Sequence, residues 1–284
     1  MAAAGAHRPV DPFYGRPTEV LSHAKDPFWG LPTSAVDWCE PNYAHTRYVA
    51  ELFNTLSSVP MVVVSLHGLW LCHRYKLEPR FYLCWAGLGV VGLGSLSFHG
   101  TLTHFGQALD ELSMIVASMA FVYVVLEAGH PEARHPWLPF VEGAYSVAFA
   151  IAYLTSPFFF PFFIVAYGAT VLLIIHQAYR VYLLYQKEGT IAGKWQRTLF
   201  WIAAAGYPGG FLLFWVPENA LCPLYPELFR MLNFHAIFHI VTTISPYCYV
   251  VFMTYHRCVV LRRRAEHRSG IAGMPYVHVM GGAP

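Results

Sequence analysis

The stretch LPFVEGAYSVAFAIAYLTSPFFFPFFIVAYGATVLLIIH, residues 138–176, decides the fold of this chain. It contains two long apolar runs, Leu138–Thr155 and Pro161–His176. Such runs approach the ~20 residues that an α-helix needs to cross ~30 Å of hydrocarbon. Because little more than Ser156-Pro157 separates them, we expect the two helices to form a tight hairpin within a membrane.

The composition of the whole chain agrees with a membrane protein. Of its 284 residues, 56% are hydrophobic, 17% are aromatic and only 12% are charged. A soluble domain usually carries about 25% charged residues. The net charge of +2 gives no reason to expect a nucleic-acid partner. The first ~50 residues are polar and rich in proline, and they lack the apolar core of a signal peptide.

We therefore predict an all-α polytopic membrane protein, a bundle of seven transmembrane helices. The expected helices are residues 51–73, 81–103, 107–128, 138–155, 157–184, 196–216 and 227–256. The segments between them contain helix breakers, namely Glu78-Pro79, Gly129-His130-Pro131, Ser156-Pro157, Glu188-Gly189 and Pro217. One catalytic bundle, residues 51–258, is expected to follow an N-terminal segment, 1–50, and to precede a basic C-terminal tail, 259–284.

The distribution of Lys and Arg predicts the orientation, because these residues are enriched in cytosolic loops. Seven spans put the two termini on opposite sides of the membrane. One side would hold 13 of the 18 basic residues, namely Arg74, Lys76, Arg80, Arg134, Arg180, Lys187, Lys194, Arg197, Arg257, Arg262, Arg263, Arg264 and Arg268. The other side would hold Arg8, Arg16, Lys25, Arg47 and Arg230. We therefore expect a cytosolic C-terminus and an N-terminus in the lumen or outside the cell.

Polar side chains interrupt three of the predicted helices at a similar depth. Ser95 and His99 lie near the end of the second span, and Asp110 lies one turn into the third. The motif NFHAIFHI places His235 and His239 about two to three turns into the seventh span, at ~1.5 Å per residue. All five side chains are therefore expected to meet a little below the luminal surface.

These residue types at this spacing predict a metal site. His235 and His239 are spaced i, i+4, so both imidazoles project from one face of the helix. With His99 as a third ligand they could hold Zn²⁺ and leave a fourth position for water. Ser95 precedes His99 by four residues, which puts its hydroxyl beside that ligand. Asp110 would lie within reach of the water as a proton acceptor.

Other polar residues in the spans have a simpler interpretation. Isolated membrane histidines often hydrogen-bond a neighbouring helix, and we interpret His67 and His176 in this way. An ionised Asp at the centre of a membrane helix costs ~2.5–3.5 kcal/mol, so Asp110 calls for a functional explanation. Glu111 points about 100° away from Asp110 on the same helix. We expect Glu111 to hydrogen-bond another helix or to make a luminal contact.

Oxygen donors cluster just before the first span, in SAVDWCEPNYAHTRYVAELFNTLSS, residues 34–58. Asp37, Glu40, Asn42 and Glu51, with the carbonyl of Trp38 between them, are hard ligands of the kind that suits Ca²⁺. Their spacing is not that of an EF-hand, so the residues alone slightly favour an ordinary capped surface loop.

Cysteine positions predict one disulfide. The chain has six cysteines, and only Cys39 and Cys222 fall outside the spans on the predicted luminal side. Because that compartment permits disulfides, we expect these two to pair. The free thiols are then Cys72, Cys84, Cys248 and Cys258.

Taken together, these motifs resemble the alkaline ceramidase family over nearly the full length of the chain. The family's opening motif is matched by FWGLPTSAVDWCEPNYAHTRYVAELFNTLSS, residues 28–58, and its Ser-x3-His motif followed by Asp is matched within GSLSFHGTLTHFGQALDEL, residues 94–112. The terminal HxxxH motif is present as His235 and His239. FWVPENALC, residues 214–222, resembles the segment around the family's luminal cysteine, although Glu218 stands where an aspartate is expected.

The resemblance implies an intramembrane zinc-dependent amidohydrolase that cleaves the N-acyl bond of ceramide. It implies zinc at His99, His235 and His239, with Asp110 and Ser95 catalytic. It also implies calcium at Asp37, Trp38, Glu40, Asn42 and Glu51. The substrate would enter sideways from the bilayer into a cavity between helices, for which the aromatic SPFFFPFF hairpin is a candidate wall. The expected location is the membrane of the endoplasmic reticulum or Golgi.

Two other functions remain open from the sequence. Adiponectin/progestin-type receptors belong to the same wider group of seven-span zinc proteins, but they have a cytosolic N-terminus and lack the DWCEPNY loop. A proton-coupled channel or transporter would use the membrane histidines as a relay and would contain no zinc.

Overall fold

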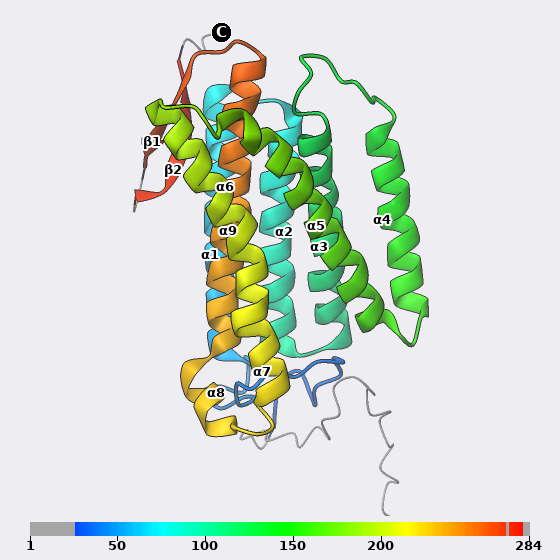
Figure 1. Ribbon diagram of the computed structural model, residues 1–284. Helices are drawn as coiled ribbons and strands as arrows, with labels where there is room; N and C mark the ends of the chain where they lie inside the picture. Colours follow the sequence, from blue (N-terminus) through cyan, green and yellow to red (C-terminus); the bar gives the residue numbers. More distant parts are fainter. Residues whose placement is uncertain (1–25, 271–272, 281–284) are drawn as a thin grey trace, which may run out of the picture.

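The computed structural model describes residues 26–270 and 273–280. Residues 1–25, with Arg8, Arg16 and Lys25 of the charge count, and residues 281–284 of the predicted tail lie outside the described residues. Within the described ranges, seven helices are long and apolar enough to cross a membrane. They stand together as one upright bundle (Figure 1), which confirms the predicted all-α seven-span class.

The spanning helices are α1 (Leu52–Tyr75), α2 (Pro79–Thr101), α3 (His104–Leu126), α4 (Leu138–Thr155), α5 (Phe159–Tyr185), α6 (Ile191–Gly210) and α9 (Phe234–Val260). α6 continues through a π-helical turn, η1 (Phe211–Trp215), into α7 (Val216–Leu221). The sixth span therefore covers Ile191–Leu221 and is longer than the predicted 196–216. A short helix, α8 (Pro226–Leu232), precedes α9.

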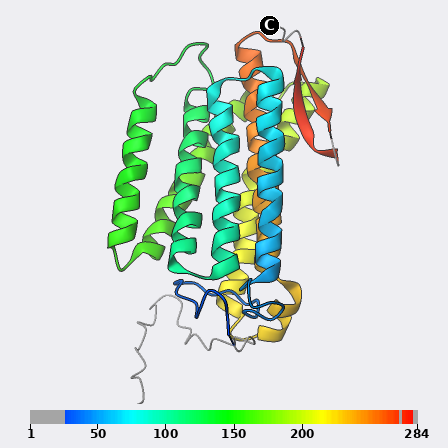
Figure 2. The same ribbon diagram turned by 180° about the vertical axis from the view of Figure 1, so that it is seen from behind.

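The last helix lies at the centre of the fold. In its membrane-spanning window 61% of the α9 residues are buried, against 17% for α5. Viewed from behind, α1, α2 and α3 stand side by side, whereas α4 stands apart from them (Figure 2). Side chains of α9 therefore face the interior, while α4 and α5 expose more of their surface to lipid.

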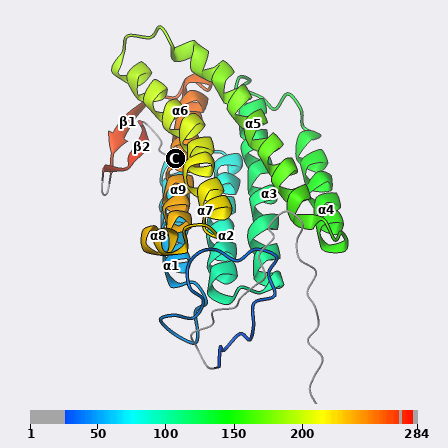
Figure 3. The same cartoon turned by 60° about the horizontal axis from the view of Figure 1, so that its bottom comes forward.

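The two ends of the bundle are built differently. One end, here called the loop end, carries the N-terminal loop, α7 and α8 (Figure 3). The opposite end, called the hairpin end, carries an antiparallel β-hairpin of β1 (Ala265–Ser269) and β2 (Pro275–Val279). Val277 and Val279 are buried in the core, and the Tyr75 hydroxyl lies 2.9 Å from Nδ1 of His278. Part of the segment expected to be a basic tail thus folds back onto the bundle.

A buried arginine fixes α9 at the hairpin end. The guanidinium of Arg257 is paired with both carboxylate oxygens of Glu78, at 2.5 and 2.8 Å. It also donates to the carbonyls of His130 and Pro131. This side chain therefore joins the last helix to the α1–α2 turn and to the loop after α3.

A tight turn positions α2 against α3 at the loop end. Leu102 adopts a left-handed conformation (φ 49°), and the Thr103 hydroxyl caps α3 by accepting the amide of Gly106 at 3.0 Å. Close approach of the helices depends on Gly94, because a Cβ there would lie 2.8 Å from the Cα of Asp110. The glycine thus allows Asp110 to lie next to the turn of α2 that carries Ser95.

The start of the seventh span differs from the prediction of one helix from residue 227. Asn233 is left-handed (φ 47°) and separates α8 from α9. Asn tolerates this conformation better than most residues because its short side chain can hydrogen-bond locally. His235 consequently lies in the first turn of α9, and His239 in the second, rather than two to three turns into a helix.

We predict that Gly94→Ala destabilises the α2–α3 contact, because the added methyl meets backbone that cannot move independently of the helix. Overpacking of this kind costs ~1–3 kcal/mol, which thermal unfolding in detergent would measure. The matched control is Gly143→Ala on α4, where a Cβ meets nothing within 4 Å. Its helix should become no less stable, because Ala has the higher helix propensity. Equal melting temperatures for both variants would contradict the prediction.

Candidate metal centre

Three buried histidines from two distant segments meet at the loop end. His99 on α2 and His235 and His239 on α9 each offer a ring nitrogen, and these atoms all lie within 4.8 Å of one another. The Nε2 atoms of His99 and His235 are 3.3 Å apart. Three convergent imidazoles form a set of ligands that can hold a divalent metal ion and leave a further coordination position open. The sequence-predicted triad is therefore brought together.

The outer nitrogens of two of these rings are held by protein groups. Nδ1 of His99 lies 2.5 Å from Oε2 of Glu51, and Nδ1 of His239 lies 2.8 Å from the Ser57 hydroxyl. Such outer partners fix the ring orientation and tautomer of metal-binding histidines. They leave the Nε2 atoms free to face one another, as a metal site requires.

His235 is oriented by stacking instead. Its ring lies on the indole of Trp38, with centroids 3.6 Å apart and an interplanar angle of 16°. Its Nδ1 has no hydrogen-bond partner among the described residues. Trp38, predicted from the sequence as a calcium ligand through its carbonyl, thus also contacts the triad with its side chain.

Ser95 is tied to a residue that the sequence interpretation missed. Its hydroxyl lies 2.8 Å from that of Ser58 on α1. Ser58 in turn lies 2.9 Å from the carbonyl of Asn54 and 3.3 Å from Nδ1 of His239. Ser58 ends the motif of residues 28–58, but the sequence alone assigned it no role, because that role follows from the packing of α1 against α2.

The two adjacent carboxylates have different surroundings. Glu111 accepts hydrogen bonds from the Gln107 amide and from the hydroxyl of Tyr153 on α4, both at 2.8 Å. The predicted bond from Glu111 to another helix is therefore confirmed. The Asp110 carboxylate makes no hydrogen bond to any of the described side chains and borders a cavity. Asp110 is thus available to a bound molecule, whereas the Glu111 carboxylate is already hydrogen-bonded to Gln107 and Tyr153.

That cavity has a volume of about 480 Å³ and lies between α2, α3, α5, α6 and α9. Ser95, Asp110, His235 and His239 line it, so two histidines of the triad and both predicted catalytic residues share one space. The remaining wall is mostly apolar and reaches Phe252 on α9, ~20 Å along the helix from His239 at ~1.5 Å per residue. Phe160 and Phe163 of the predicted aromatic wall also line it.

The predicted calcium ligands gather beside the triad, on the N-terminal loop and the start of α1. The side-chain amide of Asn42 donates to both oxygens of Asp37 at 3.1 Å. Glu40 accepts the amides of Phe53 and Asn54 at 2.7 and 2.9 Å, so it also caps α1. Oε1 of Glu51 accepts the amide of Trp38 at 3.2 Å.

The electrostatics of this cluster fit a bound cation. Burial raises the pKa of Glu51 well above its usual value, and the charges of Asp37 and Glu40 raise it further. Burial also raises the pKa of Glu40, despite its amide donors and the nearby His45. Oδ1 of Asn42 is buried without a partner among the described residues. Crowded carboxylates next to an unsatisfied carbonyl oxygen are what a hard divalent cation stabilises.

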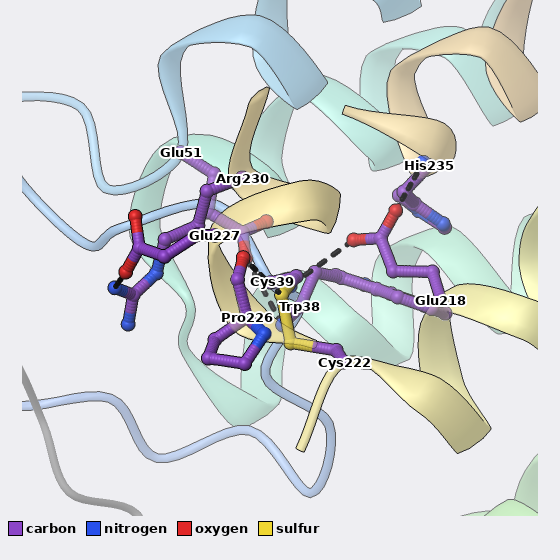
Figure 4. The surroundings of a disulfide bond; sticks show 9 residues. All are labelled: Trp38, Cys39, Glu51, Glu218, Cys222, Pro226, Glu227, Arg230 and His235. Atoms are coloured by element: carbon purple, nitrogen blue, oxygen red, sulfur yellow. Dashed lines mark hydrogen bonds and ion pairs between the residues drawn. A yellow bond between two sulfur atoms is a disulfide. The ribbon is translucent and has the colours of Figure 1, made fainter. Parts of the chain in front are cut away.

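The predicted disulfide is confirmed. Cys39 of the N-terminal loop is bonded to Cys222, which follows α7, and their Cα atoms are 5.9 Å apart (Figure 4). Cys72, Cys84, Cys248 and Cys258 are free and buried. The bond ties the loop that carries Trp38 to the segment leading into α9.

Glu218 has a structural role that the sequence did not reveal. This buried carboxylate accepts the backbone amide of Cys39 at 3.1 Å and that of His235 at 2.6 Å (Figure 4). The first amides of a helix have no partner within the helix, so Glu218 caps α9 at His235, a residue of the histidine triad. The longer side chain, unexpected at this position, reaches both amides.

Known proteins match the chain over most of its length. The ceramidase family matches residues 30–278. Alkaline ceramidase 3 of Mus musculus is 34% identical over 245 residues, which are 82% of this chain and 87% of that protein. Alkaline ceramidase of Arabidopsis thaliana is 29% identical over 247 residues, 87% of this chain and 92% of that protein. Alkaline ceramidase YPC1 of Saccharomyces cerevisiae is 27% identical and covers 80% and 78% of the two chains.

We predict that Glu218→Ala lowers stability by about 1.5–3 kcal/mol, because two buried amides lose a charged acceptor. Thermal unfolding would show the loss, and metal content after dialysis would show weaker retention at the triad. The matched control is Glu227→Ala, whose carboxylate is 87% exposed. Exposed substitutions usually change stability by less than ~0.5 kcal/mol, so a control as damaging as Glu218→Ala would refute the assigned role.

Proposed function

This chain belongs to the ceramidase family, and on that premise we propose that it hydrolyses the N-acyl bond of ceramide to a sphingoid base and a free fatty acid. The observation that carries the proposal is a shared space, because His235 and His239 of the triad, Asp110 and Ser95 border one long, mostly apolar cavity. Ceramide has a polar amide between two long chains. The amide would lie at the triad, and the chains would occupy the apolar length of the cavity.

The proposed metal is zinc, held by His99, His235 and His239. Imidazole donors suit zinc, and the outer contacts of His99 and His239 are of the kind that orient zinc ligands. When bound, zinc activates water near neutral pH and polarises a carbonyl group.

Asp110 is the proposed proton carrier of the reaction. Its carboxylate would accept a proton from the attacking water and then deliver it to the leaving amine nitrogen. The absence of another hydrogen bond to this carboxylate among the described side chains supports the role. Ser95 would donate a hydrogen bond to the oxygen of the scissile carbonyl, while Ser58 holds the Ser95 side chain in place.

The second proposed metal is calcium, with ligands from Asp37, Glu40, Asn42, Glu51 and the carbonyl of Trp38. Because Glu51 contacts His99 and Trp38 stacks on His235, a cation bound there would brace two residues of the zinc site. Its role would be to hold the N-terminal loop in place, and it would take no part in bond cleavage.

We also propose that the loop end faces the lumen and the hairpin end faces the cytosol, in the endoplasmic reticulum or Golgi. The charge count supports this orientation. The Cys39–Cys222 disulfide supports it independently, because such bonds persist in oxidising compartments. We propose the division that the sequence predicts, with a luminal segment 1–50, a catalytic bundle 51–258 and a cytosolic tail 259–284.

The relatives described above are ceramidases, which does not favour the receptor interpretation. A proton-coupled transporter is also less suitable, because zinc binding would withdraw all three histidines from a relay.

We predict that His99→Ala, His235→Ala and His239→Ala each abolish both zinc binding and ceramide hydrolysis. Elemental analysis should find about one zinc per chain in the wild type, as for a three-histidine site. His176→Ala, on the exposed face of α5, is the control and should keep zinc and activity. A zinc-free His235→Ala protein with full activity would end the hydrolase proposal.

Asp110→Asn should separate chemistry from metal binding. We expect turnover to fall by roughly 10²–10⁴-fold, the usual contribution of general acid–base catalysis, while zinc content stays at the wild-type level. Loss of zinc in this variant would instead assign Asp110 to the metal site.

For calcium, we predict that adding the ion raises the melting temperature of the wild type. At a calcium concentration of 100 times Kd, the free energy of unfolding should rise by about 2.7 kcal/mol. Asp37→Ala should abolish this response. Asp26→Ala, which removes an exposed carboxylate paired with Arg47, should respond like the wild type. Identical melting of the wild type with calcium and with chelator would refute the site.

A further inference from the structure

Two phenols bridge α5 and α6 inside the cavity. The hydroxyls of Tyr167 and Tyr207 are 2.6 Å apart, and their rings meet edge to face at 6.1 Å. Both side chains line the same cavity as His235 and His239 of the triad. Asp110 lies close enough to interact electrostatically with both. The pair is therefore a polar point in an otherwise mostly apolar wall of the cavity that the proposed proton carrier also lines.

The number of hydrogens in this pair does not match the number of acceptors. Two hydroxyls bring two hydrogens, and only one can lie between the two oxygens. The second hydrogen makes no hydrogen bond to any of the described residues. Four other hydroxyls that line the cavity donate to backbone carbonyls, namely those of Ser118, Thr242, Ser245 and Tyr249, and the hydroxyl of Ser95 pairs with that of Ser58. The phenol pair thus retains one donor for a molecule in the cavity.

The wall is irregular directly beyond this pair. Pro208 follows Tyr207, and the π-helical turn η1 begins three residues later. Proline removes one backbone donor, and π-helical turns occur frequently at functional sites. Phe211 and Trp215 of η1 also line the cavity. The distortion therefore shapes the part of α6 that faces the proposed substrate.

We propose that the Tyr167–Tyr207 pair binds a hydroxyl group of the sphingoid base and so makes the enzyme selective for N-acyl amino alcohols. This proposal rests on the function proposed above. In ceramide the carbon that bears the amide nitrogen is flanked by two hydroxyl-bearing carbons, C1 and C3. When the leaving nitrogen lies at Asp110, these hydroxyls lie in the neighbourhood where the pair offers its donor. Tyr207 is then a specificity residue that touches substrate without taking part in bond cleavage.

The test compares Tyr207→Phe with the wild type, using purified full-length protein and three amides with the same acyl chain. One is ceramide, and the other two lack the C1 or the C3 hydroxyl. We expect the variant to lose about tenfold in kcat/KM on ceramide, the value of an ordinary hydrogen bond. On the analogue that lacks the bound hydroxyl, variant and wild type should be equal. Tyr179→Phe, which changes an exposed phenol on α5, is the matched control.

Tyr167→Phe should show the same pattern, and the double variant should lose little more, because the two phenols act as one unit. Equal losses on all three amides, or no loss on any, would overturn the proposal. The rise in melting temperature that each amide causes is measured as well, because it reports binding and does not depend on turnover. If ceramide is not cleaved, the proposed function fails. In that case the shift in melting temperature caused by ceramide still tests the phenol proposal. An equal shift in the wild type and in Tyr207→Phe overturns it, and a smaller shift in Tyr207→Phe than in the wild type supports it.

Discussion

The hydrogen bond between Glu51 and Nδ1 of His99 joins the parts on which the site depends. Glu51 ends the N-terminal loop and begins α1, and it also accepts the amide of Trp38. Trp38 stacks on His235, so one loop orients rings from both α2 and α9. Two of the three imidazoles are thereby oriented by a loop that is not itself a transmembrane helix, and the third, His239, contacts Ser57 of α1.

Three carboxylates near the site differ in their hydrogen bonds: two are bonded to other parts of the protein, and one is not bonded to any of the described side chains. Glu111 is taken up by Gln107 and Tyr153, and Glu218 by two backbone amides. Each of them offsets the cost of burial with hydrogen bonds. Asp110 borders the cavity without such bonds to the described side chains. This contrast separates a candidate catalytic carboxylate from structural ones more clearly than its position in the sequence does.

Much of this arrangement could be predicted from the sequence. Long apolar runs revealed the spans, HxxxH and Ser-x3-His revealed the triad and Ser95, and the predicted topology paired Cys39 with Cys222. Other features depend on contacts that no local pattern encodes. Ser58 and Glu218 matter because of what packs against them, and the break at Asn233 follows from a left-handed residue within an apolar stretch. The β-hairpin after α9 was not predicted, because its two strands are short and its sequence resembles a polar C-terminal tail.

The disulfide and the triad both join segments that the ribosome makes far apart in time. Cys39 and Cys222 are 183 residues apart, and His99 must wait for the final helix to supply the other two rings. A nascent chain without α9 would possess only one of the three histidines of the proposed metal site. Under the proposed function, hydrolysis would therefore begin only after the last helix has been made and inserted.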